Sequence, residues 1–200
     1  MLTLFLIRHG ETDAVGKSIV GWQPGWPLNE MGRAQAERLA ATLSQFPITA
    51  IYTSPLERAV QTANPIAAQQ NLIPRLSNSL GEWRPGAWEG ERIAELDRLP
   101  EWHRFNAFRT GVRPPGGESM LEVQVRMVQQ IQCMEGQHGG EVVAAVSHAE
   151  PIRAALAHYM GVSLDLALRF EIGTASVSVV RIDAWGPKIL SVNGMGDLLV

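Results

Sequence analysis

Three short apolar runs recur along the 200-residue chain, and a stretch with helical spacing follows each of them. The runs span residues 2–7, 48–52 and 142–146, and their length and aliphatic content are typical of strands buried on both faces. Strands that alternate with helices form α/β proteins with a mainly parallel sheet. We therefore expect an α/β fold, a three-layer α/β/α sandwich whose mainly parallel central sheet carries an antiparallel edge strand.

Two serine-led patterns predict where helices begin. Ser54 can cap a helix that has Pro55 at its first position and Glu57 completing a capping box. We expect this helix to reach about residue 70, with Pro65 kinking or dividing it. Residues 119–122 form a second capping box, which precedes an apolar stripe at helical spacing.

The segment of residues 81–118 is rich in proline and aromatic side chains and shows only short helical stretches. We predict that it forms a small cap-like insertion over the end of the sheet where the candidate site described below also lies. Further along, residues 175–182 and 188–192 flank a Trp-Gly-Pro turn, which indicates a closing hairpin. Because the length suits one core, a single domain is expected over residues 1–200.

Charge and composition limit the partners of the chain. The net charge is −3, so no overall field attracts nucleic acid or an anionic lipid surface. No run approaches the roughly 20 apolar residues of a membrane span, and the apolar start is too short for a signal peptide. The single cysteine, Cys133, excludes an internal disulfide framework and fits a reducing compartment. We therefore expect a cytoplasmic protein with no nucleic-acid or membrane partner.

Cations and histidines follow the predicted strands at the points where the strands end. Arg8 and His9 come directly after the first run, and His148 comes after the third. Arg58 lies in the first turn of the helix that follows the second run. Ligands of open parallel sheets bind at the carboxyl ends of the strands, and helix N-termini favour anions. These residues therefore predict an anion pocket at one edge of the sheet.

The remaining histidines, His103, His138 and His158, lack such polar company at a strand end and are assigned to the surface or the core. No group of His, Asp and Glu residues has convincing metal-ligand spacing. We therefore predict neither a metal nor a cofactor, because the arginines supply the positive charge of the pocket.

Five blocks extend this pattern over almost the whole chain. They are Arg-His-Gly-Glu-Thr at 8–12, Ser-Pro-Leu-Glu-Arg-Ala and Gln-Thr-Ala within 54–63, Leu-Gly-Glu and Gly-Ala-Trp-Glu-Gly within 80–90, Pro-Gly-Gly-Glu-Ser at 115–119 and Val-Ser-His at 146–148. In this order they resemble the histidine phosphatase superfamily (branch 1), the phosphoglycerate mutase-like proteins. One Arg-His-Gly triplet alone would be weak support, whereas five ordered blocks are specific.

The resemblance implies a role for each residue of the anion pocket. His9 would be the nucleophile, a neutral imidazole that attacks phosphorus and forms a phosphohistidine. Arg8, Arg58 and a protonated His148 would surround the phosphoryl oxygens, where negative charge must be stabilised. Glu82 would protonate the leaving oxygen and then activate water.

This role requires that Glu82 is protonated before the first step, so its pKa should be raised by a dry pocket. The aromatic neighbours Trp83 and Trp88 favour such a pocket. The choice of Glu82 rather than Glu89 follows the spacing of the family's acidic block.

Three positions depart from the family pattern. Val15 stands six residues after the nucleophile, where the family often has an asparagine that contacts phosphate, so this contact is missing or is supplied elsewhere. Trp26 lies near a place where an acidic residue is common, and Ala149 replaces the usual glycine after His148. These departures leave phosphoryl transfer intact and leave the substrate open.

Several loop residues are candidates for contact with the substrate. Four tryptophans fall in loops expected near the site: Trp22, Trp26, Trp83 and Trp88. They either form an apolar wall that selects a bulky or hydrophobic phosphate ester, or pack the cap over the sheet. Residues of the same loop and of the last block are further candidates for substrate binding: Val20, Gly21, Trp22 and Ala149.

The pattern favours a phosphomonoesterase that hydrolyses a small phosphorylated metabolite through a phosphohistidine intermediate. The expected partner is therefore a small-molecule phosphate ester, and a homodimer is kept as a hypothesis for the assembly. A phosphoglycerate mutase is the alternative within the family. Mutases are usually longer and carry Arg-His-Tyr after the acidic glutamate, where this chain has Trp-Arg-Pro at 83–85.

Two alternatives come from other classes. A protein that binds phosphorylated ligands without turnover would have lost His9 or Glu82, and the chain keeps both. A dinucleotide-binding enzyme would need Gly-x-Gly-x-x-Gly in the turn after the first strand, and the sequence lacks this motif.

Overall fold

The computed structural model describes residues 1–195, which fold around a six-stranded sheet with the order β3-β2-β4-β1-β5-β6. The strands have these bounds: β1 Leu2–Arg8, β2 Ile48–Thr53, β3 Arg75–Leu76, β4 Val142–Ser147, β5 Val177–Asp183 and β6 Gly186–Gly194. The pairs β2–β3, β2–β4 and β1–β4 are parallel, whereas β1–β5 and β5–β6 are antiparallel. The mainly parallel α/β sheet is therefore confirmed, and its antiparallel part is the predicted closing hairpin.

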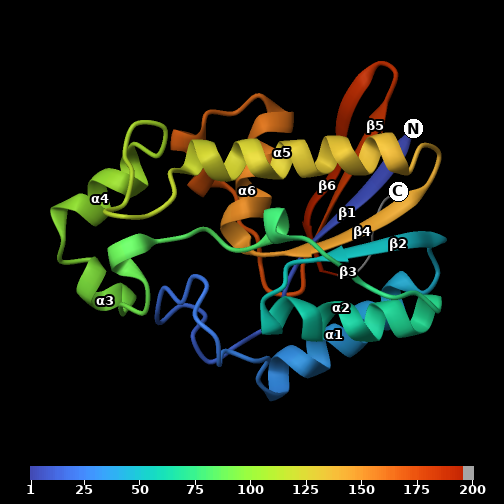
Figure 1. Ribbon diagram of the computed structural model, residues 1–200, viewed down its shortest axis with the longest axis horizontal. Helices are drawn as coiled ribbons and strands as arrows, with labels where there is room; N and C mark the ends of the chain where they lie inside the picture. The colour runs from blue at the N-terminus through green and yellow to red at the C-terminus, as the bar shows by residue number, and fades with distance from the viewer. Residues whose placement is uncertain (196–200) are drawn as a thin grey trace.

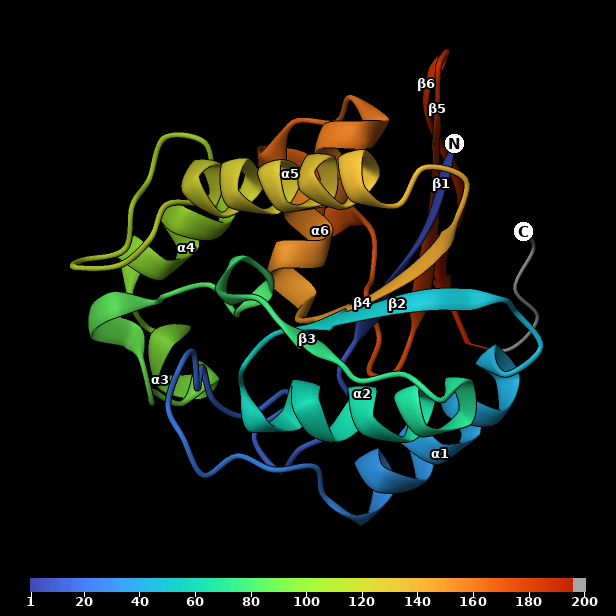
Figure 2. The same ribbon diagram turned by 45° about the vertical axis from the view of Figure 1, so that its right-hand side comes forward.

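Helices cover both faces of the sheet (Figures 1 and 2). α1 (Glu30–Leu43) and α2 (Glu57–Gln70) pack together on one face, and α5 (Met120–Gln137) and α6 (Ala149–Met160) pack together on the other. α2 passes through Pro65 as one helix, so the predicted division there is wrong. Its buried face packs against α1 and β2, and this packing outweighs the backbone hydrogen bond that proline removes. Within residues 1–195, no helix has both the length and the apolar character needed to cross a membrane.

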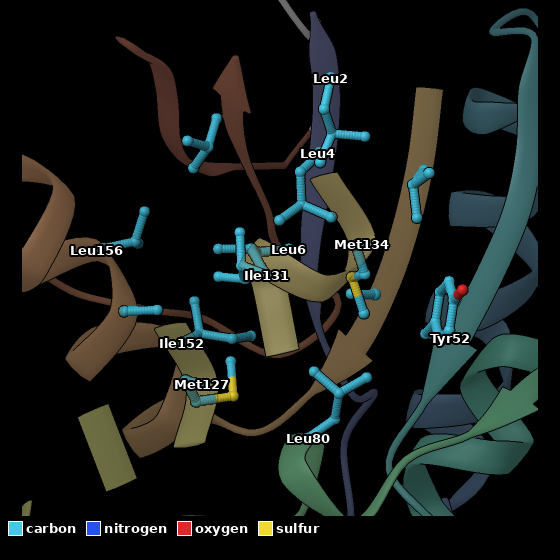
Figure 3. Close-up of a cluster of buried hydrophobic side chains, with 14 of the residues drawn as sticks. Leu2, Leu4, Leu6, Tyr52, Leu80, Met127, Ile131, Met134, Ile152 and Leu156 are labelled. Carbon is cyan, nitrogen blue, oxygen red and sulfur yellow. The ribbon is translucent and has the colours of Figure 1, made fainter. Parts of the chain in front are cut away.

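The first strand divides its side chains between the two helical layers. Leu2, Leu4 and Leu6 are buried on the side of α5 and α6, whereas Phe5 and Ile7 are buried on the side of α1 and α2. Figure 3 shows the first cluster, to which the two helices contribute Met127, Ile131, Met134, Ile152 and Leu156. Because β1 is covered on both faces, it appears in the sequence as a continuous apolar run.

Figure 1 shows two short helices, α3 (Ile93–Leu96) and α4 (Pro100–Ala107), beyond the carboxyl ends of the parallel strands. They belong to the 81–118 segment, which also contains the 3-10 turn η2 (Gly86–Trp88). The short helices form part of the wall of the cleft described below, because Ile93 of α3 faces that cleft.

An aromatic cluster holds this segment together. Trp83 stacks on Phe105 with ring centroids 5.1 Å apart, and Trp88 meets Trp102 edge to face at 5.4 Å. The cluster packs against buried side chains of α5, α6 and the 3-10 helix η3 (Leu164–Arg169): Val123, Ala154 and Leu164. The segment is therefore anchored to the body of the molecule by its own small core.

One of the two predicted capping boxes is present. Ser119 Oγ accepts a hydrogen bond from the Glu122 N–H, and the Glu122 carboxylate accepts one from the Ser119 N–H. The box expected at Ser54 is wrong, because α2 begins at Glu57, and Leu56 occupies the N-cap position without a side-chain cap. The Ser54 hydroxyl instead accepts a hydrogen bond from the Leu56 N–H at 3.2 Å and also lies 2.8 Å from Nε2 of His148, the residue after β4.

Glu122 makes part of the stability depend on pH. Its hydrogen bonds with the Arg113 guanidinium and the Ser119 backbone lower the pKa of Glu122 to about 2. A carboxyl with a lowered folded-state pKa stabilises the fold above its unfolded pKa, and this contribution is lost as the pH falls from 4.5 towards about 2. We expect Glu122→Gln to lower the free energy of unfolding at pH 7, with a difference from the native protein that shrinks steadily below pH 4.5.

Urea denaturation across this pH range measures the effect. Glu37→Gln, on the exposed face of α1, is the matched control and should follow the native curve. A difference for Glu122→Gln that stays constant from pH 7 to pH 2 would contradict the assignment.

Candidate active site

The parallel pairing of β1 with β4 brings two of the predicted site residues together. Arg8, the last residue of β1, pairs with Ser147, the last residue of β4. His9 and His148 follow directly, and their ring centroids are 5.0 Å apart. Arg58 is the second residue of α2, the helix that follows the neighbouring strand β2. The four residues that sequence analysis placed at strand exits therefore meet at one edge of the sheet.

The His9 side chain has one ring nitrogen fixed by the backbone. Its Nδ1 lies 2.7 Å from the carbonyl oxygen of Gly10, which can only accept, so Nδ1 carries the proton. This leaves the lone pair on Nε2, to which Arg58 Nε donates at 3.3 Å. Burial, Arg58 and Arg8 lower the pKa of His9 well below its ordinary value. His9 is thus a neutral imidazole whose Nε2 keeps the lone pair that a nucleophile requires, and this lone pair accepts the long hydrogen bond from Arg58.

The two arginines of the pocket are held by backbone oxygens. Arg58 donates to the carbonyl of Gly21 at 2.9 Å, and Arg8 donates to the carbonyl of Ile172 at 2.6 Å. Burial lowers the pKa of both guanidinium groups, which nevertheless remain charged because arginine does not deprotonate in proteins. The arrangement concentrates two positive charges beside His9.

His148 is fully buried and makes two contacts of different kinds. Its Nε2 lies 2.8 Å from Ser54 Oγ, and its Nδ1 lies 3.9 Å from Glu82 Oε2. Burial, followed by the charge of Arg58, lowers the pKa of His148 well below its ordinary value. The lowered pKa favours a neutral imidazole here, whereas the sequence analysis expects a protonated His148 around a phosphoryl group.

Glu82 is the carboxyl group of the cleft. Burial raises its pKa against the opposing effects of Arg58 and of the Trp83 N–H, which donates to Glu82 Oε1 at 2.9 Å. The direction of this shift agrees with the raised pKa expected from the sequence. Glu89 instead accepts a hydrogen bond from the Trp22 backbone at 2.5 Å and does not line the cleft, so the geometry favours Glu82.

Arg126 on α5 holds the turn that carries Glu82, a contact that sequence reasoning missed. Its guanidinium donates to the carbonyls of Ser79, Gly81 and Glu82 at 2.7, 2.8 and 3.1 Å. Glu118 pairs with the same guanidinium at 2.7 Å. The available signal was Glu118 itself, an acidic residue in the fourth block for which sequence analysis assigned no partner.

The loop after His9 is fixed by close backbone contacts. The Gly10 N–H donates to Thr62 Oγ1 at 3.0 Å, which gives a structural reason for the Gln-Thr-Ala part of the second block. Gly10 also packs against the backbone of Gly32 at the start of α1, where a Cβ atom would overlap the Gly32 carbonyl. Only glycine fits this approach, so α1 and α2 together hold the loop that follows His9.

These residues open into a cleft with a volume of about 290 Å³. Arg8, His9, Arg58 and Glu82 line it, whereas His148 lies just behind them. Three of the four predicted substrate-binding candidates also line it: Val20, Gly21 and Ala149. The fourth candidate, Trp22, stands outside this lining and donates its indole N–H to the Glu82 carbonyl at 2.5 Å. Val15 lines the cleft without a side-chain hydrogen bond, as its residue type requires.

Of the four tryptophans considered for a substrate-selecting wall, one lines the cleft. Trp83 lines the cleft, whereas Trp22, Trp26 and Trp88 do not. Trp102 of α4, which sequence analysis did not select, takes part in the wall beside Trp83. Both residues also belong to the aromatic cluster, so the same two side chains line the cleft and pack the 81–118 segment.

Sequence analysis also missed a charged pair in the cleft wall. Arg109 is buried and donates to Glu150 Oε2 and to Asn106 Oδ1, the latter at 3.2 Å. Glu150 Oε1 accepts a hydrogen bond from Arg153. Burial alone would raise the pKa of Glu150, but Arg109 and Arg153 together lower it, so the carboxylate is ionised. Arg109 and Glu150 are 41 residues apart, and nothing local in the sequence relates them.

Within residues 1–195, no group of three or more His, Cys, Asp or Glu side chains is arranged to hold a metal ion. The positive charge that faces the cleft comes from arginines: Arg8, Arg58 and Arg109.

The fold and these strand-end residues define a class of protein. Residues 4–194 match the family model of the histidine phosphatase superfamily (branch 1), so the chain belongs to this superfamily. The resemblance of the five blocks is thereby confirmed.

Three similar proteins show where the chain stands within the superfamily. It is 33% identical over 202 residues to phosphoserine phosphatase 1 of Hydrogenobacter thermophilus, which covers 96% of this chain and 92% of the relative. The structure of YhfR from Bacillus stearothermophilus aligns with a TM-score of 0.90 at 30% identity, over 97% of both chains. A phosphoserine phosphatase mutant from Entamoeba histolytica, solved with phosphoserine, aligns at 0.87 and 27% identity over 98% of both chains.

The contacts of Arg126 with the turn at Glu82 and with Glu118, here called the Arg126 clamp, lead to a testable prediction. We expect Arg126→Lys to lower the kcat for hydrolysis of an aryl phosphate by about tenfold or more, because lysine cannot hold three carbonyls and Glu118 at once. The unfolding temperature reports on the fold separately. Arg113→Lys, which alters an exposed pair with Glu122, is the control and should keep the native kcat. Equal kcat values for the two variants would show that the clamp does not position Glu82.

Proposed function

We propose that the chain is a phosphomonoesterase that transfers phosphate from a small phosphorylated metabolite to His9 and then to water. The observation that carries the proposal is the neutral His9, whose Nε2 lies 3.3 Å from Arg58 in a cleft that also holds a Glu82 with raised pKa. A nucleophile, fixed cations and a protonated acid are the groups that phosphoryl transfer needs when no metal takes part.

In the first step, the lone pair of His9 Nε2 attacks phosphorus and the bond from phosphorus to the ester oxygen breaks. Arg8 and Arg58 hold the phosphoryl oxygens by charge-assisted hydrogen bonds. Glu82 gives its proton to the leaving oxygen, so the alcohol departs neutral and Glu82 becomes a carboxylate. The product is a phosphohistidine at His9.

In the second step, a water molecule takes the place of the alcohol. The Glu82 carboxylate removes a proton from this water, whose oxygen attacks phosphorus while the bond to His9 Nε2 breaks. Phosphate leaves, and Glu82 is again protonated. One buried carboxyl therefore acts as acid and then as base, and its raised pKa favours the proton uptake that completes the cycle.

The outer cleft supports a small polar substrate. The cleft is lined by the apolar side chains of Ile19, Trp83 and Trp102 and also by the charged pair Arg109 and Glu150. The Glu150 carboxylate accepts one hydrogen bond at each oxygen, so lone pairs remain for a hydroxyl or ammonium group of the leaving alcohol. The similarity to the phosphoserine phosphatases above supports a metabolite of this size.

Hydrolysis fits the cleft better than the two alternative functions. A phosphoglycerate mutase must bind a second anionic group, and Arg109, the further arginine lining the described cleft, is already neutralised by Glu150. A protein that only binds phosphate gains nothing from a buried carboxyl with a raised pKa, because that group adds no positive charge.

Replacing the nucleophile tests the proposal directly. We expect native protein in chelator to release phosphate from an aryl phosphate and to form an acid-labile phosphoenzyme. His9→Ala should lose both, with a fall in kcat of about a thousandfold or more. His158→Ala, on an exposed part of α6, is the matched control and should retain activity. Native protein that is folded yet releases no phosphate would refute the proposal.

The acid role of Glu82 predicts a dependence on both pH and leaving group. Because the first step needs protonated Glu82, kcat/KM for an alkyl phosphate should fall as the pH rises through the raised pKa of this group. Glu82→Gln should still release a burst of para-nitrophenol from its phosphate ester, since this leaving group needs little protonation, and then stall at the phosphoenzyme. A burst followed by turnover at the rate of the native protein would show that Glu82 is not needed for hydrolysis of the phosphohistidine.

A further inference from the structure

Ser54, the residue directly after β2, is fully buried behind the phosphoryl pocket. Its backbone N–H donates to the Val146 carbonyl at 2.9 Å, which fixes the residue beside the end of β4. Its hydroxyl makes two contacts, with the Leu56 N–H at 3.2 Å and with His148 Nε2 at 2.8 Å. The hydroxyl is therefore held on both sides, and the direction of each hydrogen bond can be worked out.

The Leu56 N–H can only donate, so it takes one lone pair of Ser54 Oγ. The hydroxyl proton of Ser54 then needs an acceptor, and within residues 1–195 the remaining partner of Oγ is His148 Nε2. If Nε2 donated instead, the Ser54 proton would be buried without an acceptor, which costs on the order of 1–3 kcal/mol. The satisfied arrangement has Ser54 Oγ–H donating to Nε2.

A neutral imidazole that accepts at Nε2 carries its proton on Nδ1. His148 Nδ1 is buried and has no hydrogen-bond partner among the described residues. It lies 3.9 Å from Glu82 Oε2, and the ring meets that of His9 edge to face with centroids 5.0 Å apart. The unused donor thus lies near Glu82, which lines the cleft together with His9.

We propose that Ser54 is a positioning residue that sets the tautomer of His148, so that the uncharged imidazole donates its Nδ1–H to the phosphoryl oxygens. The inference rests on the proposed phosphoryl transfer at His9. With a neutral donor at Nδ1, His148 need not be protonated in a pocket that already holds the positive charges of Arg8 and Arg58. The lowered pKa of His148 agrees with this neutral donor.

The native protein provides the first test, with ¹⁵N-labelled histidine and NMR of the imidazole nitrogens. His148→Gln assigns the His148 signals by their loss. We expect a proton on Nδ1 and a lone pair on Nε2, and a shift of the Nδ1–H signal when inorganic phosphate is added. A proton on Nε2 of the neutral ring, or an Nδ1–H signal that phosphate leaves unmoved, would overturn the inference.

Substitution provides the second test. Ser54→Ala should yield a mixture of His148 tautomers and lower kcat by about tenfold to a hundredfold with a smaller change in KM, whereas Ser54→Thr, which keeps the hydroxyl, should recover activity. Ser178→Ala is the matched control, because Ser178 is also a fully buried strand serine and its hydroxyl accepts from the Asn193 N–H at 3.1 Å. Equal losses in Ser54→Ala and Ser178→Ala would assign Ser54 a structural role only.

The two tests separate this inference from the proposed function. Neither the tautomer nor the response to inorganic phosphate requires turnover, so both are measurable in a protein that hydrolyses nothing. An inactive protein with the Nδ1 tautomer and the phosphate shift would refute the phosphatase proposal alone. An active protein with the Nε2 tautomer would refute the role of Ser54 alone.

Discussion

The parallel pairing of β1 with β4 is the constraint on which the site depends. Its register sets Arg8 opposite Ser147, and the His9 N–H continues the ladder by donating to the Ser147 carbonyl at 3.0 Å. Backbone hydrogen bonds therefore place His9 beside His148 before any side chain contributes. A slip of one residue would turn every side chain of β1 to the opposite face, so the two hydrophobic clusters that hold the register also hold the geometry of the site.

Burial then shifts the pKa values of the two histidines and of Glu82 towards their neutral forms. Desolvation disfavours the charged form of every titratable side chain, so it lowers the pKa of His9 and His148 and raises that of Glu82. The arginines are the exception, because their guanidinium groups stay protonated under the same conditions. The pocket consequently presents fixed positive charge from Arg8 and Arg58. Beside it lie three groups with shifted pKa values: His9, His148 and Glu82.

Sequence patterns predicted the parts of the fold and site that are local. The apolar runs located the strands, and the residues at their ends located His9, Arg58 and His148. Ser54 was misinterpreted because a capping pattern describes only near neighbours, whereas its hydroxyl contacts a residue 94 positions away. Arg126 lies on a helix whose apolar stripe was recognised, but its three carbonyl partners belong to a turn that no periodicity describes. Arg109 and Glu150 meet only because the 81–118 segment packs on α6.

The walls of the cleft come from several parts of the chain. Arg8, His9 and Arg58 stand at strand ends and at the start of α2. Glu82 stands at the start of the 81–118 segment, which also carries Trp102, Asn106 and Arg109. Changes in α4 can therefore reshape the space for the leaving alcohol without disturbing the sheet register that aligns His9. The part of the wall that α4 forms is thus anchored by aromatic packing, whereas the position of His9 is anchored by backbone pairing in the sheet.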